Sequence, residues 1–187
     1  MKFNTGRIKH LTTKNNIEVY VGVGSFEDKT YVKVSKYDGT AVGIEGPNII
    51  IATGSKPSSL PFINIDKERV ITSTEAFKLK EVPKHLLVIG VGVIGLELGS
   101  VYKRLGAEVT VIEYMDKIVP GMDVDVSKEL QKVFKKQGIK FATSHKVTSD
   151  QKNGDKVVVK ETDKKDREVE LNGEYCLVSR GRKTYTE

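Results

Sequence analysis

Apolar and polar positions alternate along the first part of this chain. The alternation covers residues 17–21, 30–34 and 42–45, and this period of two is typical of half-buried strands. Residues 48–52 then form a predominantly apolar run, which predicts a buried strand. The pattern therefore predicts that residues 1–57 form a β-meander that leads into a buried strand.

The second part combines short apolar runs with helical periodicity. Residues 86–89 and 109–112 are apolar runs, and between them apolar side chains recur every three or four residues, as on one face of a helix. A further helix is predicted over residues 126–137 and a third strand over residues 139–147. This alternation of strand and helix is typical of a parallel sheet covered by helices.

Shorter elements complete the expected order. They comprise a short helix, a hairpin turn, two meander strands and a last apolar strand, at residues 73–77, 153–154, 157–159, 168–171 and 176–178 respectively. The expected fold class is α/β, with a Rossmann-like parallel sheet and an inserted β-meander over residues 85–180. A connector at residues 58–84 precedes this domain, and residues 181–187 leave it again.

Three glycines follow the first strand of the second part in the spacing Gly-x-Gly-x-x-Gly. Gly90 permits a tight turn into the helix, Gly92 lets a pyrophosphate approach the backbone, and Gly95 lets the helix pack closely on the strands. The unpaired N–H groups at the start of the helix favour an anion. A glycine-rich turn in an ordinary α/β domain is the alternative interpretation of these residues.

The second strand ends in Glu113, which follows Gly90 by 23 positions, close to the offset of about 20 that is usual in dinucleotide-binding units. A carboxylate there can accept hydrogen bonds from the adenosine ribose and repels a 2′-phosphate, so the motif favours NAD(H) over NADP(H). Strand, glycines, helix, second strand and acid occur in the expected order, which favours nucleotide binding. Glu97, one turn into the helix, is either a ligand contact or a solvated acid near a helix start.

Composition and charge argue against a membrane, secreted or nucleic-acid-binding protein. The chain has 187 residues, of which 38% are hydrophobic and 30% charged, as in globular proteins. It contains no apolar run long enough for a membrane span, and its first residues lack the apolar core of a signal peptide, so the cytosol or a mitochondrial matrix is expected. The net charge of +6 comes from lysines scattered among acids, which argues against nucleic-acid binding.

Cysteine and histidine provide little chemistry in this sequence. Cys176 is the single cysteine, so the chain has neither an internal disulfide nor a dithiol pair, and we expect a buried thiol in a strand. His10, His85 and His145 lie far apart and share no motif. We therefore predict no metal site and no catalytic residue among them.

Longer phrases around the glycine motif resemble the NAD domain of the dihydrolipoyl dehydrogenase family, the flavoprotein components of 2-oxo acid dehydrogenase complexes. The phrases are residues 93–101 and 104–113, with support from residues 8–11, 49–55 and 71–76. The resemblance implies that the first part of the chain, residues 1–57, belongs to a flavin domain, toward which residues 181–187 return. It also implies FAD and NAD as cofactors, a homodimer, and assembly into a 2-oxo acid dehydrogenase complex.

The resemblance assigns roles to individual positions. The implied NAD-binding residues are Gly90, Gly92, Val93, Ile94, Gly95, Glu97, Glu113, Val147 and Gly181. Among these, Ile94 gates the nicotinamide pocket, Glu97 meets the nicotinamide end, and Val147 packs on adenine. The implied FAD contacts are Gly22, Thr53, Gly54 and Ser55.

The chain also departs from this family. It contains neither the redox disulfide spaced C-x4-C, nor an FAD fingerprint, nor the acid–base histidine, so we expect NAD(H) binding without turnover by this chain alone. Arg180 replaces a small apolar residue, and Thr184 replaces a proline. Two alternatives stay open: part of another flavoprotein, such as an NADH oxidase or disulfide reductase, or a non-catalytic assembly fragment that associates through its exposed apolar residues 49–52.

Overall fold

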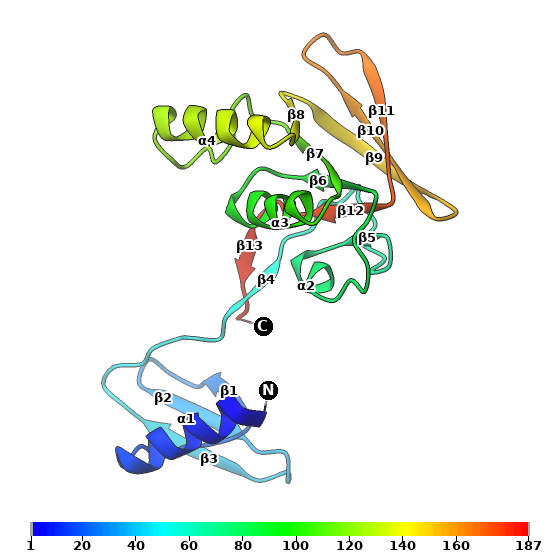
Figure 1. The fold of residues 1–187 in the computed structure, drawn as a ribbon. Helices are drawn as coiled ribbons and strands as arrows, with labels where there is room; N and C mark the ends of the chain where they lie inside the picture. The colour runs from blue at the N-terminus through cyan, green and yellow to red at the C-terminus, as the bar shows by residue number, and fades with distance from the viewer. Residues whose placement is uncertain (1, 187) are drawn as a thin grey trace. The chain divides into compact units, whose positions relative to one another are not determined.

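The computed structural model describes residues 2–186, with side chains from Gly6 onward. The chain forms two compact units that divide between Ala52 and Thr53 (Figure 1). The sequence pattern places this boundary after residue 57, but the short strand β4 (Ser55–Pro57) pairs antiparallel with β13 (Arg182–Thr184) and belongs to the second unit. Residues 53–57 therefore belong to the second unit.

The first unit contains one helix and a three-stranded antiparallel sheet. Its elements are α1 (Lys2–Lys14), β1 (Val23–Phe26), β2 (Tyr31–Ser35) and β3 (Ala41–Glu45), and the strands lie in the order β1-β2-β3. The strands expected around residues 30–34 and 42–45 are confirmed. The strand expected at residues 17–21 is wrong, because pairing with β2 begins only at Val23, opposite Ser35.

The buried strand expected at residues 48–52 is also wrong. Within the described part of the chain these residues pair with no strand, and Ile50 is 91% exposed. Ile51 is exposed as well. An apolar run indicates that a segment gains free energy by burial, but it does not supply the neighbouring surface that would cover it.

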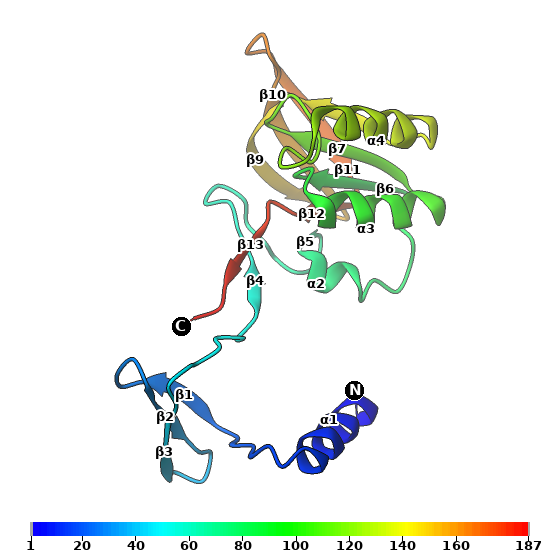
Figure 2. The same ribbon diagram turned by 90° about the vertical axis from the view of Figure 1, so that its left-hand side faces the viewer.

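The second unit is built on a five-stranded parallel sheet, as the sequence predicts. In spatial order its strands are β5 (Val70–Ile71), β12 (Tyr175–Val178), β6 (His85–Ile89), β7 (Glu108–Glu113) and β8 (Lys140–Thr143). The helices are α2 (Ser73–Ala76), α3 (Val93–Arg104) and α4 (Val124–Lys136). The inserted meander comprises β9 (Lys146–Asn153), β10 (Lys156–Thr162) and β11 (Glu168–Gly173), which lie on the opposite face of the sheet from α3 and α4 (Figure 2).

Each face of the parallel sheet carries its own apolar core. Along β6, Leu86 and Val88 belong to the core shared with the helices, whereas Leu87 and Ile89 belong to the core shared with the meander. This division follows from the period of two in a strand, which sends successive side chains to opposite faces. A strand covered on both faces must be apolar throughout, which explains the continuous apolar runs of β6 and β7.

The ends of the helices are specified locally. The side chain of Thr72 accepts a hydrogen bond from the backbone of α2, and Glu75 completes a capping box. The carboxylate of Asp123 caps α4 by accepting from the N–H groups of Asp125 and Val126. These caps confirm the helix starts expected near residues 73 and 126.

The single strand expected over residues 139–147 is two strands. β8 ends at Thr143 and β9 begins at Lys146, and between them Ser144 has a φ of +58°. The backbone here leaves the parallel sheet and enters the antiparallel meander, so a continuous strand is impossible. The N–H groups of Ser144 and His145 donate to the carbonyls of Met115 and Glu113, which fixes the crossing point beside the end of β7.

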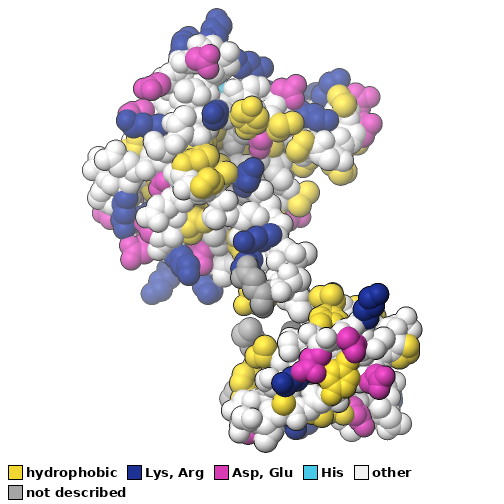
Figure 3. All heavy atoms as spheres, turned by 180° about the vertical axis from the view of Figure 1, so that it is seen from behind, with side chains coloured by type: hydrophobic (Ala, Val, Ile, Leu, Met, Phe, Trp, Pro, Cys, Tyr) yellow, Lys and Arg dark blue, Asp and Glu magenta, His cyan; other side chains and the backbone are white. Residues whose placement is uncertain are grey.

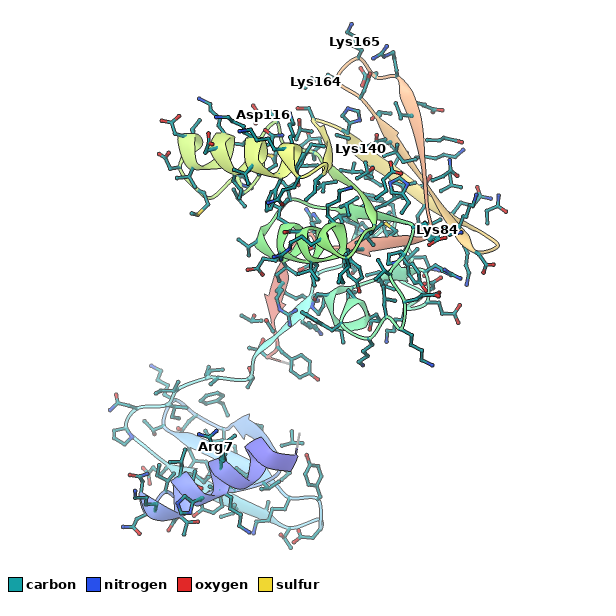
Figure 4. The ribbon with its side chains drawn as sticks, in the orientation of Figure 1. Arg7, Lys84, Asp116, Lys140, Lys164 and Lys165 are labelled. Atoms are coloured by element: carbon teal, nitrogen blue, oxygen red, sulfur yellow. The ribbon has the colours of Figure 1, made fainter. Side chains whose placement is uncertain are left out.

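The charged surface of the second unit mixes both signs. Lysine and arginine side chains are interspersed with acids in the space-filling view (Figure 3), and Lys164 and Lys165 extend from the tip between β10 and β11 (Figure 4). This mixture resembles an ordinary solvated surface rather than a track for a nucleic-acid backbone. No helix of the described chain is both long and apolar enough to cross a bilayer.

The close packing of α3 on the sheet can be tested by comparing the same substitution at two glycines, one packed and one not. A Cβ at Gly95 would lie 2.6 Å from the carbonyl oxygen of Gly90, whereas a Cβ at Gly92 would meet nothing nearer than 3.9 Å. We expect Gly95→Ser to lower the free energy of unfolding by about 1–3 kcal/mol through overpacking. Gly92→Ser should leave it unchanged or higher, because serine is a good helix N-cap. Urea unfolding measures both, and equal effects of the two substitutions would contradict this account.

Candidate functional site: a cavity at the carboxyl ends of the parallel strands

The turn between β6 and α3 requires glycine. Gly90 has a φ of +100°, a backbone conformation that other residues rarely adopt. A Cβ there would also lie 2.7 Å from the carbonyl oxygen of Ser179, at the end of β12. The N–H of Gly90 donates to the carbonyl of Ile112 at 2.9 Å, so the turn stays attached to β7 as it leaves the sheet.

The first turn of α3 has no side-chain cap. Its cap residue Gly92 forms no side-chain cap hydrogen bond, and Val93 is 61% exposed. A Cβ at Gly92 would clash with nothing, since its nearest neighbour would be the carbonyl oxygen of Ser179 at 3.9 Å. An uncapped helix start with open space before it suits a diphosphate, which needs both N–H donors and close approach.

Glu113 ends β7 with its carboxylate held by the backbone. One carboxylate oxygen accepts the N–H of Val91 at 2.9 Å, and the other accepts the N–H of Met115 at 2.9 Å. Val91 lies in the glycine turn, so this carboxylate connects the second strand to the glycine motif. Each oxygen still has a lone pair available, so the group can also accept hydrogen bonds from a vicinal diol.

A cavity of about 350 Å³ opens at this end of the sheet. Its lining residues come from the strand ends, the meander and the connector: Leu60, Phe62, Ile89, Gly90, Ile112, Glu113, Tyr114, Met115, His145, Lys146, Val147 and Arg180. It brings together Gly90, Glu113 and Val147, three of the residues expected to bind NAD. Apolar walls with a few convergent polar groups are typical of a small-molecule site.

The remaining expected NAD residues lie around the start of α3 or beyond it. Ile94 and Glu97 line a second, more open hollow of about 640 Å³, together with Phe77 and Arg182. Gly181 has a φ of +115° and stands between Arg180, which lines the first cavity, and Arg182, which lines the second hollow. The expected site is therefore divided into an adenosine end at Glu113 and another end at Glu97.

The expected FAD contacts fall in different units. In the first unit, Gly22 packs so closely on β2 that a Cβ would lie 2.4 Å from the carbonyl oxygen of Ser35. In the second, the hydroxyl of Ser55 accepts from Nε of Arg182 at 2.7 Å, and that of Thr53 donates to the carbonyl of Tyr185. Gly54 has a φ of +85°. These contacts give each residue a local role in its own unit.

The sequence-based expectations gave no binding role to His145, which lines the cavity, and did not name its neighbour Glu161. Glu161 on β10 is 1% exposed, and its Oε1 lies 2.9 Å from Nδ1 of His145. Burial raises the pKa of the Glu161 carboxyl above its usual range, and the contact with His145 opposes that rise. Glu161 alternates in phase with the buried residues Val157 and Val159, a pattern that could have revealed an inward-facing acid.

Cys176 lies at the centre of the meander-side core, as the sequence predicts. Its side chain is fully buried on β12, and desolvation raises the pKa of the thiol far above its usual value. The thiolate is the reactive form of cysteine, so this thiol is chemically inert in the folded unit.

Comparison with known proteins identifies a matching protein family and similar sequences. A family profile for pyridine nucleotide-disulphide oxidoreductases matches residues 2–187. Dihydrolipoamide dehydrogenase of Chaetomium thermophilum is 48% identical over 98% of this chain, and mitochondrial dihydrolipoyl dehydrogenase of Schizosaccharomyces pombe is 44% identical over 100% of it. The chain spans 37% of the length of each of these two relatives.

Solved structures show the same fold. The crystal structure of LpdA from Mycobacterium tuberculosis aligns with a TM-score of 0.81 and 29% identity, covering 97% of this chain and 40% of that one. The HOCl-induced flavoprotein disulfide reductase RclA from Escherichia coli aligns with a TM-score of 0.77 and 26% identity, covering 98% of this chain and 41% of that one. The parallel sheet with its inserted meander is thus shared with flavoprotein disulfide reductases.

The buried acid predicts an unusual dependence of stability on pH. Because the pKa of Glu161 is raised by folding, the unfolded chain loses this proton first, and stability falls as pH rises through the window above the ordinary glutamate pKa. We expect Glu161→Leu to raise the free energy of unfolding at pH 8 by on the order of 1 kcal/mol, with a smaller gain at pH 5. Urea unfolding at the two pH values measures this, and a loss of stability at pH 8 would contradict it.

Proposed function

The chain belongs to the pyridine nucleotide-disulphide oxidoreductase family, and we propose that it forms the NAD(H)-binding part of a dihydrolipoyl dehydrogenase-like flavoprotein. The observation that carries the proposal is the cavity that joins Gly90, Glu113 and Val147 beside the uncapped start of α3. In open α/β sheets, ligands bind outside the carboxyl ends of the strands, which is where this cavity lies.

The residues present fit a dinucleotide part by part. The start of α3 and the open space at Gly92 suit the pyrophosphate, since an anion there meets unpaired N–H groups and the positive end of the helix. Glu113 would hold the adenosine ribose, and Val147 would pack on the adenine. Ile94 and Glu97, in the second hollow, would meet the nicotinamide end.

The carboxylate of Glu113 favours NAD(H) over NADP(H). Both of its oxygens already accept backbone N–H groups, so the carboxylate is oriented before the nucleotide arrives. A ribose diol can add hydrogen bonds to such a group, whereas a 2′-phosphate would place like charges together. Bound NAD supplies a nicotinamide that accepts hydride, and the residues of this chain would bind and orient it.

Activity, partners and compartment are proposed from the relatives. In a longer enzyme the chain would help pass hydride from reduced FAD to NAD+ during oxidation of dihydrolipoamide, and the enzyme would be a homodimer within a 2-oxo acid dehydrogenase complex. Gly22 and Thr53–Ser55 stay as candidate FAD contacts. Relatives from Schizosaccharomyces pombe and Dictyostelium discoideum are described as mitochondrial, which supports a mitochondrial matrix or, in a bacterium, the cytosol.

A second candidate function is association through apolar surface. Ile50 is 91% and Ile51 is 61% exposed, which favours contact with another apolar surface. A mass that rises with concentration in light scattering and ignores NADH would support an assembly role. The comparison with RclA likewise keeps a disulfide reductase with another substrate as an alternative parent.

Calorimetric titration of the 187-residue chain with NADH and NADPH tests the proposed function. We expect NADH to bind and NADPH to bind much more weakly. Glu113→Gln should weaken NADH binding about 10-fold, because hydrogen bonds to a charged group contribute about 1.5–3 kcal/mol, and should narrow the preference over NADPH. Glu113→Ala should weaken it further.

Glu108→Gln, at the other end of β7, is the matched control. Glu108 pairs with Lys140 at the surface and does not line the cavity, so NADH affinity should stay unchanged. Failure of the wild-type chain to bind either nucleotide would overturn the proposal.

The 187-residue chain should not oxidise dihydrolipoamide with NAD+. That reaction needs a dithiol to accept electrons, and the sequence contains one cysteine, whose side chain is fully buried. Following NADH absorbance with dihydrolipoamide and NAD+ as substrates measures this, with and without added FAD. Turnover above the rate of a heat-denatured control would show that the chain carries a different electron acceptor.

A further inference from the structure

His145 lines the cavity of about 350 Å³ that contains Glu113, which we call the adenosine cavity, and the buried acid Glu161 contacts its ring. Glu161 faces the apolar core between the meander and the parallel sheet, and its Oε2 has no hydrogen-bond partner among the described residues. Burial of a carboxyl group without full pairing costs free energy, and an apolar side chain in its place would avoid that cost. Glu161 therefore lowers the free energy of unfolding compared with an apolar residue, and a binding role would explain an acid at this position.

The contact of Glu161 is directed at one ring. His145 lies two residues before Val147, and Val147 is the register partner of Glu161 across the β9–β10 ladder. His145 lies immediately before β9, and its Nδ1 is 2.9 Å from Oε1 of Glu161. A register shift between Lys160 and Glu161 accompanies this arrangement. The main chain of His145 is fixed too, because its N–H donates to the carbonyl of Glu113 at 2.9 Å.

His145 lines the same cavity as Glu113 and Val147, and its side chain is 23% exposed. With Nδ1 held by Glu161, Nε2 is the nitrogen left for a ligand, and it has no partner among the described residues. The other charged groups that line this cavity are Glu113, Lys146 and Arg180. A carboxyl group that holds one imidazole nitrogen sets the orientation of the ring and the hydrogen-bonding role of the other nitrogen.

We propose that His145 binds the adenosine half of the dinucleotide through Nε2 and that Glu161 is the residue that positions its ring. This inference rests on the proposed nucleotide site. It explains why a carboxyl group is buried at position 161, since this group destabilises the fold but fixes the orientation of the His145 ring. The adenosine half is the part concerned, because the cavity of His145 is the one that contains Glu113, whereas Glu97 lies in the other hollow.

Binding of ADP-ribose, which lacks the nicotinamide, tests the proposal in the 187-residue chain. His145→Asn removes Nε2 but retains an amide that can reach Glu161, and we expect affinity for ADP-ribose and NADH to fall about 3- to 10-fold, the range of one hydrogen bond. Glu161→Leu should weaken both ligands to a similar extent while raising stability. Glu161→Gln, which keeps an acceptor for the ring, should recover most of the lost affinity.

His85→Asn is the matched control. His85 is also half-buried, with Nε2 2.9 Å from the hydroxyl of Thr110, but it begins β6, at the opposite end of the strand from Gly90, and it does not line the cavity. Its substitution should leave ADP-ribose affinity unchanged. The NMR resonance of the His145 ring gives a direct readout, and its absence from the spectrum of His145→Asn identifies it. This resonance should shift when ADP-ribose is added to the wild-type chain.

The outcomes separate this inference from the function on which it rests. If the wild-type chain binds ADP-ribose and His145→Asn binds it equally well, the nucleotide site stands and the role of His145 is overturned. If Glu161→Gln binds as weakly as Glu161→Leu, His145 still counts as a contact but positioning by Glu161 is overturned. If the wild-type chain binds neither ADP-ribose nor NADH, both the proposed function and this inference fail.

Discussion

The close approach of α3 to the ends of β6 and β12 is the constraint on which the rest of the second unit depends. Gly95 lies against the carbonyl of Gly90, and Gly90 lies against the carbonyl of Ser179, with no room for a Cβ at either glycine. This contact places the start of α3 at the carboxyl end of the sheet, where a Cβ at Gly92 would meet nothing nearer than 3.9 Å. Gly90 and Gly95 thus set the packing that positions the start of α3, whereas Gly92, the expected pyrophosphate contact, carries no such packing constraint.

The second face of the sheet completes the site. Because β6, β7 and β12 send alternate residues to the meander, that face needs an apolar cover, which Val147, Val157 and Val159 help to supply. The chain must cross from β8 to β9 to build this cover, and the crossing passes beside Glu113. His145, Lys146 and Val147 at this crossing line the cavity together with Glu113, so the path of the chain onto the second face also forms part of the cavity.

Much of the second unit could be predicted from sequence because its signals are local. The glycine spacing, the caps near Thr72 and Asp123, and the Asn153–Gly154 turn each specify a conformation within a few residues. The strands expected at residues 17–21 and 48–52 were wrong for the opposite reason. An alternating or apolar segment indicates a surface that favours burial, but it does not specify which other segment covers that surface. The break after Thr143 could not be predicted either, because the residue with a positive φ is Ser144 and the sequence has no glycine there to indicate a turn.

The site shows the same division between local and non-local information. Gly90 and Glu113 were recognisable because a motif relates them, whereas His145 and Glu161 come together only through the register of β9 and β10. Every group of the adenosine cavity, from Leu60 to Arg180, nevertheless belongs to the second unit. The carboxylate of Glu113 is held by backbone N–H groups of that unit alone. The geometry of this cavity is therefore set by the packing of the second unit, which contains every residue that lines it.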